Sequence, residues 1–225
     1  MLHADYANFK WPIRRFRDYL ERQLEKQGVT VHLGTEATPE GIRAIGYDAI
    51  IAAVGAVPKK PRVQGADSSD VLTHVSVFGR EHALGKHVIV VGGSESATAT
   101  ALYLAQSGHQ VTILTRRERL ATDAQFSHYY SGLEHALREQ KELRPVTCAK
   151  TVAVTDKTVT YLDRDGVEHT VVGDNVVACG GMRALQQEAV AFAECADQFF
   201  AIGDCNRVGN IHTCTRSAFS AAMQI

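Results

Sequence analysis

The chain has 225 residues, enough for one large domain or two small ones, and hydrophobic residues make up 45% of it. Its 24 lysines and arginines against 25 acidic residues give a formal net charge of −1, so no overall basic field attracts nucleic acid or an anionic membrane. No apolar run reaches the length that spans a bilayer, and the first residues lack the apolar stretch of a secretory signal, so a cytoplasmic protein is expected.

Helix and strand signals alternate in the first quarter of the chain. Apolar residues at helical spacing predict an amphipathic helix over residues 13–25, which Gly28 ends. A short strand over 29–33 follows, and Pro39 marks the first position of a second helix. The continuous apolar run 47–54 predicts a strand that is buried on both faces of a parallel sheet.

A βαβ unit is predicted in the middle of the chain. A strand over 87–91 runs into a turn of glycine and serine, then into a helix over about 96–106, and a second strand covers 110–114. The unit is about 30 residues long, as such units are. A further helix over 125–143 is predicted to end at Pro145.

The rest of the chain is predicted as strands followed by one helix. The strands cover 147–154, 158–163, 168–172, 175–178 and 199–204. The first three are short and closely spaced, which predicts a three-stranded β-meander. A helix from about Thr215 is predicted to run to the end of the chain.

The turn after the first strand of the βαβ unit carries the main functional signal. It matches the pattern G-x-G-x-x-G/A and consists of Gly92, Gly93, Ser94, Glu95, Ser96 and Ala97. Gly92 permits the tight turn, Ala97 lets the helix lie close to the strand, and the free N–H groups of the helix start suit a diphosphate. Ser94 replaces the middle glycine: its side chain either takes space from a phosphate or donates its hydroxyl to one. A tight turn without a ligand is the alternative.

The turn after the second strand indicates which dinucleotide is bound. An acidic residue there would bind the ribose 2′-OH of NAD. This chain instead has Thr115, Arg116 and Arg117, and guanidinium groups pair well with a 2′-phosphate. The turn therefore favours NADP(H) over NAD(H), with a solvated basic turn as the alternative.

Other residues carry little chemistry on their own. The five cysteines form no CxxC pair, which argues against a disulfide framework, a dithiol redox pair and a zinc ribbon, and no metal site is predicted. No constellation of histidine, serine or acid suggests a catalytic side chain. Gly180 and Gly181 follow the strand 175–178, either as a chain crossing beside a nicotinamide or as an ordinary turn.

A resemblance to a family rests on the order of four motifs. They are A-A-V-G-A-V-P at 52–58, Q-G at 64–65, V-V-G-G at 90–93 and F-A-I-G-D at 200–204. This order resembles the flavoprotein reductases with two dinucleotide-binding domains. The resemblance implies that Gly55 lies in the turn leading to the NAD(P)H domain, and that Gly203 and Asp204 return the chain to FAD, where the aspartate binds the ribityl chain.

Within that group, the segment 9–54 resembles the C-terminal half of the family of 2,4-dienoyl-CoA reductase, enoate reductase and trimethylamine dehydrogenase. The resemblance implies NADP(H) and FAD as cofactors, with FMN and a 4Fe-4S cluster expected only in an N-terminal barrel that is missing here. The first FAD fingerprint is expected before Met1, so the chain is interpreted as a fragment of a larger enzyme. Electrons would pass to an enoyl- or amine-type substrate.

The predicted fold class is therefore α/β: a Rossmann-type NAD(P)-binding domain with a parallel sheet and a β-meander, plus part of an FAD-type domain. Residues 1–70 and 178–225 are assigned to the partial FAD domain, whose two segments pair, and 71–177 to the NAD(P)H domain. The expected partners are a nicotinamide nucleotide and the missing barrel, with a homo-oligomer left open. The alternative function is a non-catalytic, ADP-binding scaffold, which Ser94 and Ala99 favour. A dehydrogenase acting alone would not account for Asp204.

Overall fold

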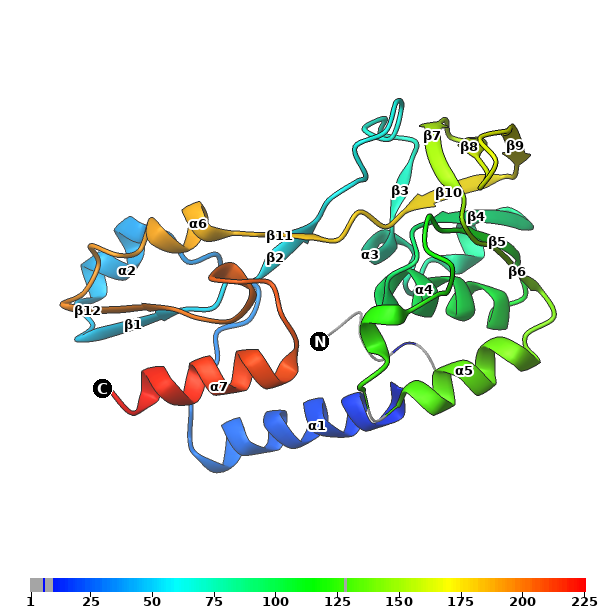
Figure 1. The fold of residues 1–225 in the computed structure, drawn as a ribbon. Coiled ribbons are helices and arrows are strands. Elements are labelled where there is room, and N and C mark those ends of the chain that lie inside the picture. Colours follow the sequence, from blue (N-terminus) through cyan, green and yellow to red (C-terminus); the bar gives the residue numbers. More distant parts are fainter. Residues whose placement is uncertain (1–5, 7–9, 128) are drawn as a thin grey trace. The chain divides into compact units, whose positions relative to one another are not determined.

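The computed structural model describes residue 6 and residues 10–127 and 129–225 of the chain (Figure 1). It divides into two compact units, one formed by Met1–Val29 and Pro58–Gly181, the other by Thr30–Val57 and Met182–Ile225. The predicted boundaries at 70/71 and 177/178 both fall inside the first unit. Each unit is described by itself below.

Five parallel strands form the central sheet of the first unit, in the order β3-β10-β4-β5-β6. Their bounds are Leu72–Thr73 for β3, Asn175–Ala178 for β10, His87–Val91 for β4, Gln110–Leu114 for β5 and Leu143–Val146 for β6. The strands β4, β5 and β10 have the bounds that the apolar runs predicted. The α/β fold with a parallel sheet is thereby confirmed.

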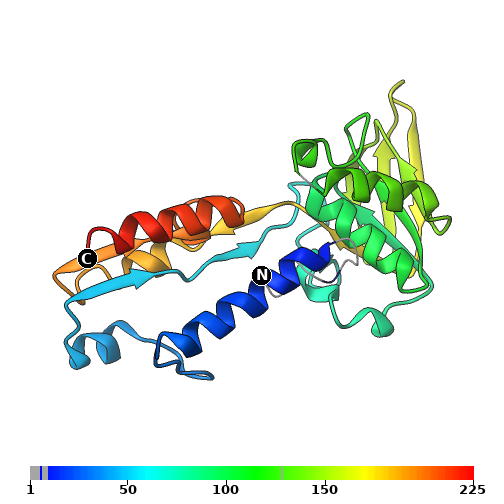
Figure 2. The ribbon, with the colours of Figure 1, turned by 90° about the horizontal axis from the view of Figure 1, so that it is seen from below.

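Alternate residues of the central strands face two different layers. Val88 and Val90 pack with the helix α4 (Glu95–Gln106), whereas Ile89 and Val91 pack with the β-meander. The antiparallel meander consists of β7 (Lys150–Val154), β8 (Thr158–Leu162) and β9 (Glu168–Val172). Figures 1 and 2 show the helices on one face of the sheet and the meander on the other. Burial on both faces explains why these strands read as unbroken apolar runs.

The strand β6 corrects one prediction. The helix expected over 125–143 is shorter, since α5 covers Tyr130–Glu139, and the residues around Pro145 form a strand instead. Proline donates no hydrogen bond to a ladder and is tolerated at the edge of a sheet. Because β6 is the last strand of the sheet and pairs only with β5, Pro145 fits there.

One long helix and several short elements complete the first unit. The predicted N-terminal helix is confirmed as α1 (Trp11–Lys26), with Gly28 just beyond it at φ 66°. None of the residues of α1 is buried. The remaining elements are α3 (His74–Val77) and the 3₁₀ turns η2 (Glu81–Ala83) and η3 (Thr122–Ala124).

The second unit is built around two strands from distant parts of the chain. β1 (Ala49–Ala52) pairs in parallel with β12 (Gln198–Ala201), as the predicted pairing of the two outer segments requires. The other elements are α2 (Pro39–Ile45), β2 (Ala56–Pro58), which pairs with β11 (Met182–Ala184), α6 (Gln186–Val190), η4 (Gly203–Cys205) and α7 (Ile211–Ala222).

Three predictions fail around this unit. The strand expected over 29–33 does not form, because no described strand pairs with it, and Leu33 is 86% exposed. The strand over 47–54 is not buried on both faces, because its sheet has only two strands, and Ile51 remains 41% exposed. The last helix begins at Ile211 rather than near Thr215, because the side chain of Asn210 accepts a hydrogen bond from Thr213 N–H and caps the helix.

Among the described residues, no helix combines the length and the apolar character needed to cross a bilayer.

Candidate functional site

The glycine-rich turn (residues 92–97) joins β4 to α4 and leaves no room for side chains at its two glycines. Gly92 has φ 141°, and a Cβ there would lie 2.9 Å from the carbonyl oxygen of Cys179. A Cβ on Gly93 would lie 2.0 Å from Oγ1 of Thr115. Both positions therefore require glycine, because neighbouring chain segments approach the backbone closely.

Ser94 is the N-cap of α4. Its Oγ accepts a hydrogen bond from Ala97 N–H at 3.3 Å, and its carbonyl accepts the Oγ1–H of Thr98 at 2.9 Å. A serine cap satisfies one of the free N–H groups at a helix start. The serine that replaces the middle glycine thus holds the helix end in place. Ala97 and Ala99 are both buried in the core, Ala97 fully.

An aspartate that the sequence reasoning missed lies at the start of α4. The N–H of Glu95 donates to both carboxylate oxygens of Asp123, at 3.0 and 3.2 Å. The adjoining Ala121 donates its N–H to the carbonyl oxygen of Gly93 at 3.0 Å, so the segment folds back over the glycine-rich turn. The sequence carries only a general signal for this acid, because helix starts favour negative charge. It does not show which acidic residue binds there.

The side chain of Glu95 adds a second carboxylate at this helix start. It forms an ion pair with Lys10, whose side chain is almost fully buried. Burial raises the pKa of Tyr129, and the charges of Glu95 and Asp123 raise it further. The site thus contains two acids, compensated by Lys10 and by one of the arginines described next.

The arginine turn (residues 115–119) follows β5 and reaches the same helix start. The side chain of Thr115 is buried, and its Oγ1 accepts from Arg117 N–H at 3.1 Å. The guanidinium of Arg117 donates to Asp123 Oδ1 at 3.1 Å and to Thr122 Oγ1 at 2.9 Å. Arg117, Asp123 and the N–H of Glu95 therefore form one connected chain of hydrogen bonds.

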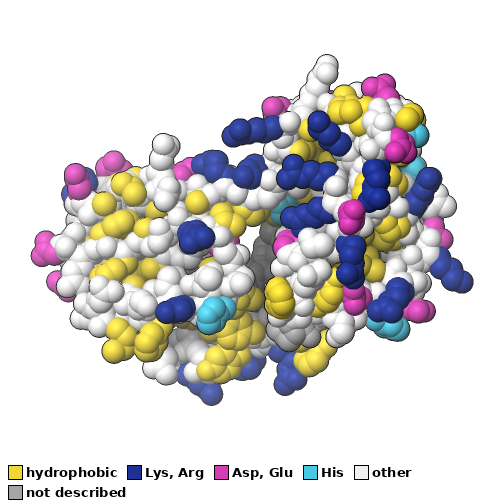
Figure 3. Space-filling model, in the orientation of Figure 1, with side chains coloured by type: hydrophobic (Ala, Val, Ile, Leu, Met, Phe, Trp, Pro, Cys, Tyr) yellow, Lys and Arg dark blue, Asp and Glu magenta, His cyan; other side chains and the backbone are white. Residues whose placement is uncertain are grey.

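Neighbouring charges in the arginine turn are paired elsewhere. Glu118 pairs with Arg164 at 2.7 Å, and Arg119 pairs with Glu134 at 3.2 Å. The side chain of Arg116 is exposed and makes no hydrogen bond or ion pair within the described part of the chain. Figure 3 shows basic and acidic side chains interspersed over the visible face of the first unit, in agreement with this pairing.

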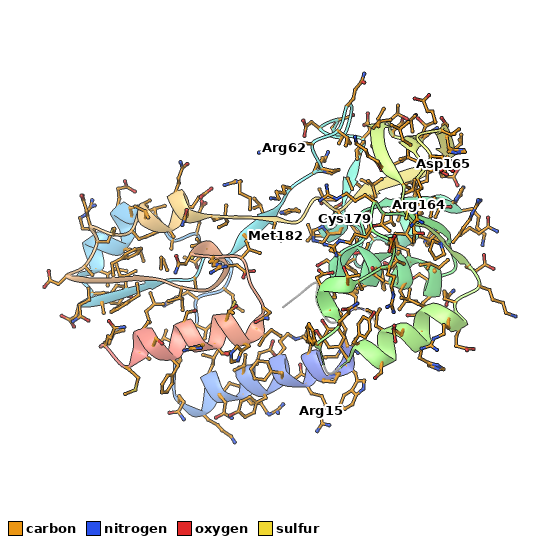
Figure 4. The ribbon with its side chains drawn as sticks, in the orientation of Figure 1. Arg15, Arg62, Arg164, Asp165, Cys179 and Met182 are labelled. Atoms are coloured by element: carbon orange, nitrogen blue, oxygen red, sulfur yellow. The ribbon has the colours of Figure 1, made fainter. Side chains whose placement is uncertain are left out.

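The end of β10 closes the site on the other side of β4. Cys179 lies where β10 ends (Figure 4), and its N–H donates to the carbonyl oxygen of Val91 at 2.9 Å. Burial raises the pKa of this thiol to about 12, so it stays protonated. A Cβ on Gly180 would lie 2.4 Å from the carbonyl oxygen of Lys59, and Lys59 N–H donates to the carbonyl oxygen of Gly181. Gly180 and Gly181 thus pack directly against another chain segment.

The remaining candidate residues lie in the second unit, beyond the carboxyl ends of β1 and β12. Gly55 and Gly203 have φ angles of 82° and 63°. The carboxylate of Asp204 accepts from Gly209 N–H at 3.0 Å and lies 3.6 Å from Sγ of Cys214. Burial, followed by the charge of Asp204, raises the pKa of the Cys214 thiol. Among the described residues, no group of histidine, cysteine or acidic side chains is arranged to hold a metal ion.

A parallel sheet with a glycine-rich turn at the carboxyl end of its central strand defines a Rossmann-type dinucleotide-binding fold. The family model described as "Pyridine nucleotide-disulphide oxidoreductase" matches residues 38–218, and the chain belongs to that family. Membership implies binding of FAD and NAD(P)H.

Three relatives illustrate the similarity. The chain is 28% identical to an NADH oxidase of Thermoanaerobacter brockii and 26% identical to a cinnamate reductase of Clostridium sporogenes, in each case over 97% of its length. A structure of 2-naphthoyl-CoA reductase in complex with 2-naphthoyl-CoA covers 99% of the chain with a TM-score of 0.90 and 26% identity. The chain spans 34%, 32% and 34% of these three proteins, or about a third of their length.

Proposed function

We propose that the chain is the part of a flavin-dependent NADPH oxidoreductase that takes up electrons from NADPH. The diphosphate of NADPH lies at the start of α4, and its 2′-phosphate lies at the arginine turn. NADPH supplies a hydride and FAD accepts it, so the chain itself needs to bind and orient rather than to act as an acid or base. No catalytic side chain is assigned.

The glycine-rich turn is the observation that carries this proposal. Its two glycines sit where any Cβ would collide with Cys179 or Thr115, so the backbone of the turn is kept bare beside the helix start. A bare backbone at a helix start is what a diphosphate needs. The arginine turn reaches the same helix start, because Arg117 donates to Asp123 and Asp123 accepts from the N–H of Glu95.

The choice of NADPH over NADH rests on Arg116 and Arg117. Arg116 is exposed and makes no side-chain bond within the described residues, so its guanidinium is available to a 2′-phosphate. Guanidinium pairs with phosphate in a forked, two-point geometry. One relative is named an NADH oxidase, so the binding test compares NADPH with NADH.

The second unit is proposed to hold part of FAD. Gly55 and Gly203 give two sharp turns at the carboxyl ends of paired parallel strands, the usual position for a dinucleotide in such sheets. The carboxylate of Asp204 is turned toward the backbone of Gly209 and is only partly buried, so it can accept a ribityl hydroxyl.

The rest of the enzyme is proposed from its relatives. Proteins three times as long leave room for an N-terminal barrel with FMN and a 4Fe-4S cluster, to which electrons would pass. The names cinnamate reductase and 2-naphthoyl-CoA reductase favour a conjugated, enoyl-type substrate, with an amine-type substrate as the alternative from the family resemblance. A cytoplasmic location belongs to the same proposal.

A fluorescence titration of the chain with NADPH and NADH tests the cofactor assignment. We expect NADPH to bind about tenfold or more tightly than NADH, the worth of one good guanidinium–phosphate contact. Arg116→Ala should remove most of that preference and leave NADH affinity nearly unchanged. Arg138→Ala, at an exposed arginine of α5, is the matched control. Equal affinity of the unaltered chain for both nucleotides would contradict the assignment.

A non-catalytic scaffold that holds ADP or no nucleotide is the second candidate, and the two carboxylates at the start of α4 favour the form without nucleotide. Glu95 and Asp123 place negative charge where a diphosphate would lie. Calorimetry with ADP and NADPH separates the two functions. Tight ADP binding with no added affinity for NADPH would support the scaffold, whereas a clear gain for NADPH supports the oxidoreductase.

A further inference from the structure

We propose that Asp123 is an internal anion that occupies the phosphate position of the glycine-rich turn, so that a dinucleotide binds only when this carboxylate leaves the start of α4. This inference rests on the proposed function, because it concerns how the same site is opened and how strongly it discriminates between nucleotides.

The geometry of Asp123 is that of a bound anion rather than of a local helix cap. The residue stands 28 positions after Glu95 in the chain, yet both of its oxygens accept the first N–H of α4, at 3.0 and 3.2 Å. The local cap is already supplied by Ser94, which accepts from Ala97 N–H. A carboxylate that returns from a distant turn to a capped helix start takes the place that the partial positive charge of the helix offers to a phosphate.

The guanidinium of Arg117 adds a second donor to this anion site. It donates to Asp123 Oδ1 at 3.1 Å, so the carboxylate lies between a helix N–H and an arginine. These are the two kinds of donor that the proposed function assigns to the phosphates of NADPH. One N–H cannot serve Asp123 and a diphosphate at full strength, so the two anions compete.

The carboxylate can leave at modest cost. The side chains of Asp123 and Arg117 are 45% and 42% exposed, so water can replace their mutual contact, and an ion pair at such exposure contributes little to stability. The turn that carries Asp123 is fixed near the site by Ala121, whose N–H donates to Gly93, and Ala121 itself has φ 51°. Rotation of one side chain therefore opens the site while the backbone remains in place.

The other charges around the helix start set the direction of the effect. Glu95 faces the same region and is neutralised by Lys10, and the hydroxyl of Tyr129 stays protonated because its pKa is raised. Removing the charge of Asp123 thus lowers the negative charge at the site and releases Arg117. The loss of negative charge should raise the affinity for every nucleotide that places a phosphate at the helix start. The release of Arg117 should raise the affinity further for nucleotides with a 2′-phosphate.

Binding assays on the chain with Asp123→Ala test the inference. The probes are NADPH, NADH and 2′,5′-ADP, followed by calorimetry or fluorescence. We expect Asp123→Ala to bind NADPH and 2′,5′-ADP roughly tenfold more tightly than the unaltered chain, because one charge-assisted hydrogen bond no longer has to be broken. NADH should gain less, since it has no phosphate for Arg117.

Two further variants keep the test decisive. Asp123→Asn preserves the shape and the acceptor oxygen but removes the charge, so it should give a smaller gain, and it replaces Asp123→Ala if that variant does not fold. Glu142→Gln removes one negative charge from an exposed residue that precedes β6, at the other end of the parallel strands from the glycine-rich turn. It should change affinity by less than about twofold.

The outcomes separate this inference from the proposed function. Unchanged or weaker binding in both Asp123 variants, with clear binding by the unaltered chain, would overturn the internal anion and leave the nucleotide site standing. An equal gain in Glu142→Gln would overturn it too, because the effect would then come from the general charge of the chain. Absence of binding in the unaltered chain and in every variant would contradict the proposed function itself.

Discussion

The two units use the same element types with opposite results for burial. In the first unit, β4 lies between neighbours on both sides and layers on both faces, and its Ile89 is fully buried. In the second unit, β1 has one partner strand, and Ile51 of a similar apolar run is 41% exposed. Whether a strand is buried therefore depends on the elements around it. An apolar run predicts a strand more reliably than it predicts that the strand is buried.

The largest expected effect sharpens this comparison directly. Ile89→Ala should lower the free energy of unfolding of the first unit by about 3 kcal/mol, because it opens a cavity in a packed core. Ile51→Ala makes the same chemical change in the second unit and should cost about 0.5–1 kcal/mol, because that side chain is already partly in water. Urea denaturation of both variants measures the difference. Equal losses would show that the two strands are equally buried in solution.

The contrast also explains which elements were predictable. The bounds of β4, β5 and β10 followed from their apolar runs, because each is enclosed by layers that come from the same stretch of chain. Local pattern predicts the end of a helix where β6 lies, because a proline such as Pro145 usually ends a helix. Only the edge position of β6 in the sheet explains the proline. Edge positions depend on tertiary structure, so local pattern does not reveal them.

The candidate site likewise contains parts that local sequence predicts and parts that it does not. The glycine-rich turn and the arginine turn are local motifs, and the sequence placed both beside the βαβ unit. Asp123 reaches Glu95 across 28 residues, a contact that no spacing rule contains. The sequence does not reveal the ion-pair partners of Glu118 and Arg119 either, because Arg164 and Glu134 come from other elements. Sequence therefore indicated the kind of site, whereas the balance of charge within it required the structure.

The smallest expected effect compares a cysteine from each unit. Burial raises the pKa of Cys179 to about 12, whereas the raised pKa of Cys214 comes from burial and from the charge of Asp204. Both shifts favour the unreactive thiol, so at pH 8 iodoacetamide should label Cys214 slowly and Cys179 more slowly still. Removing the charge with Asp204→Asn should speed labelling of Cys214 about threefold and leave Cys179 unchanged. Mass spectrometry of the alkylated peptides gives both rates, and faster labelling of Cys179 than of Cys214 would refute the burial argument.

A titration of ¹⁵N-labelled chain with 2′,5′-ADP, followed residue by residue in amide NMR spectra, tests the central claim most directly. If a nucleotide binds across the start of α4 and the arginine turn, the amide signals of Gly93, Glu95 and Arg116 should shift together and saturate, with the signals of β9 unmoved. Saturable shifts elsewhere in the first unit, with Glu95 and Arg116 unaffected, would contradict the claim.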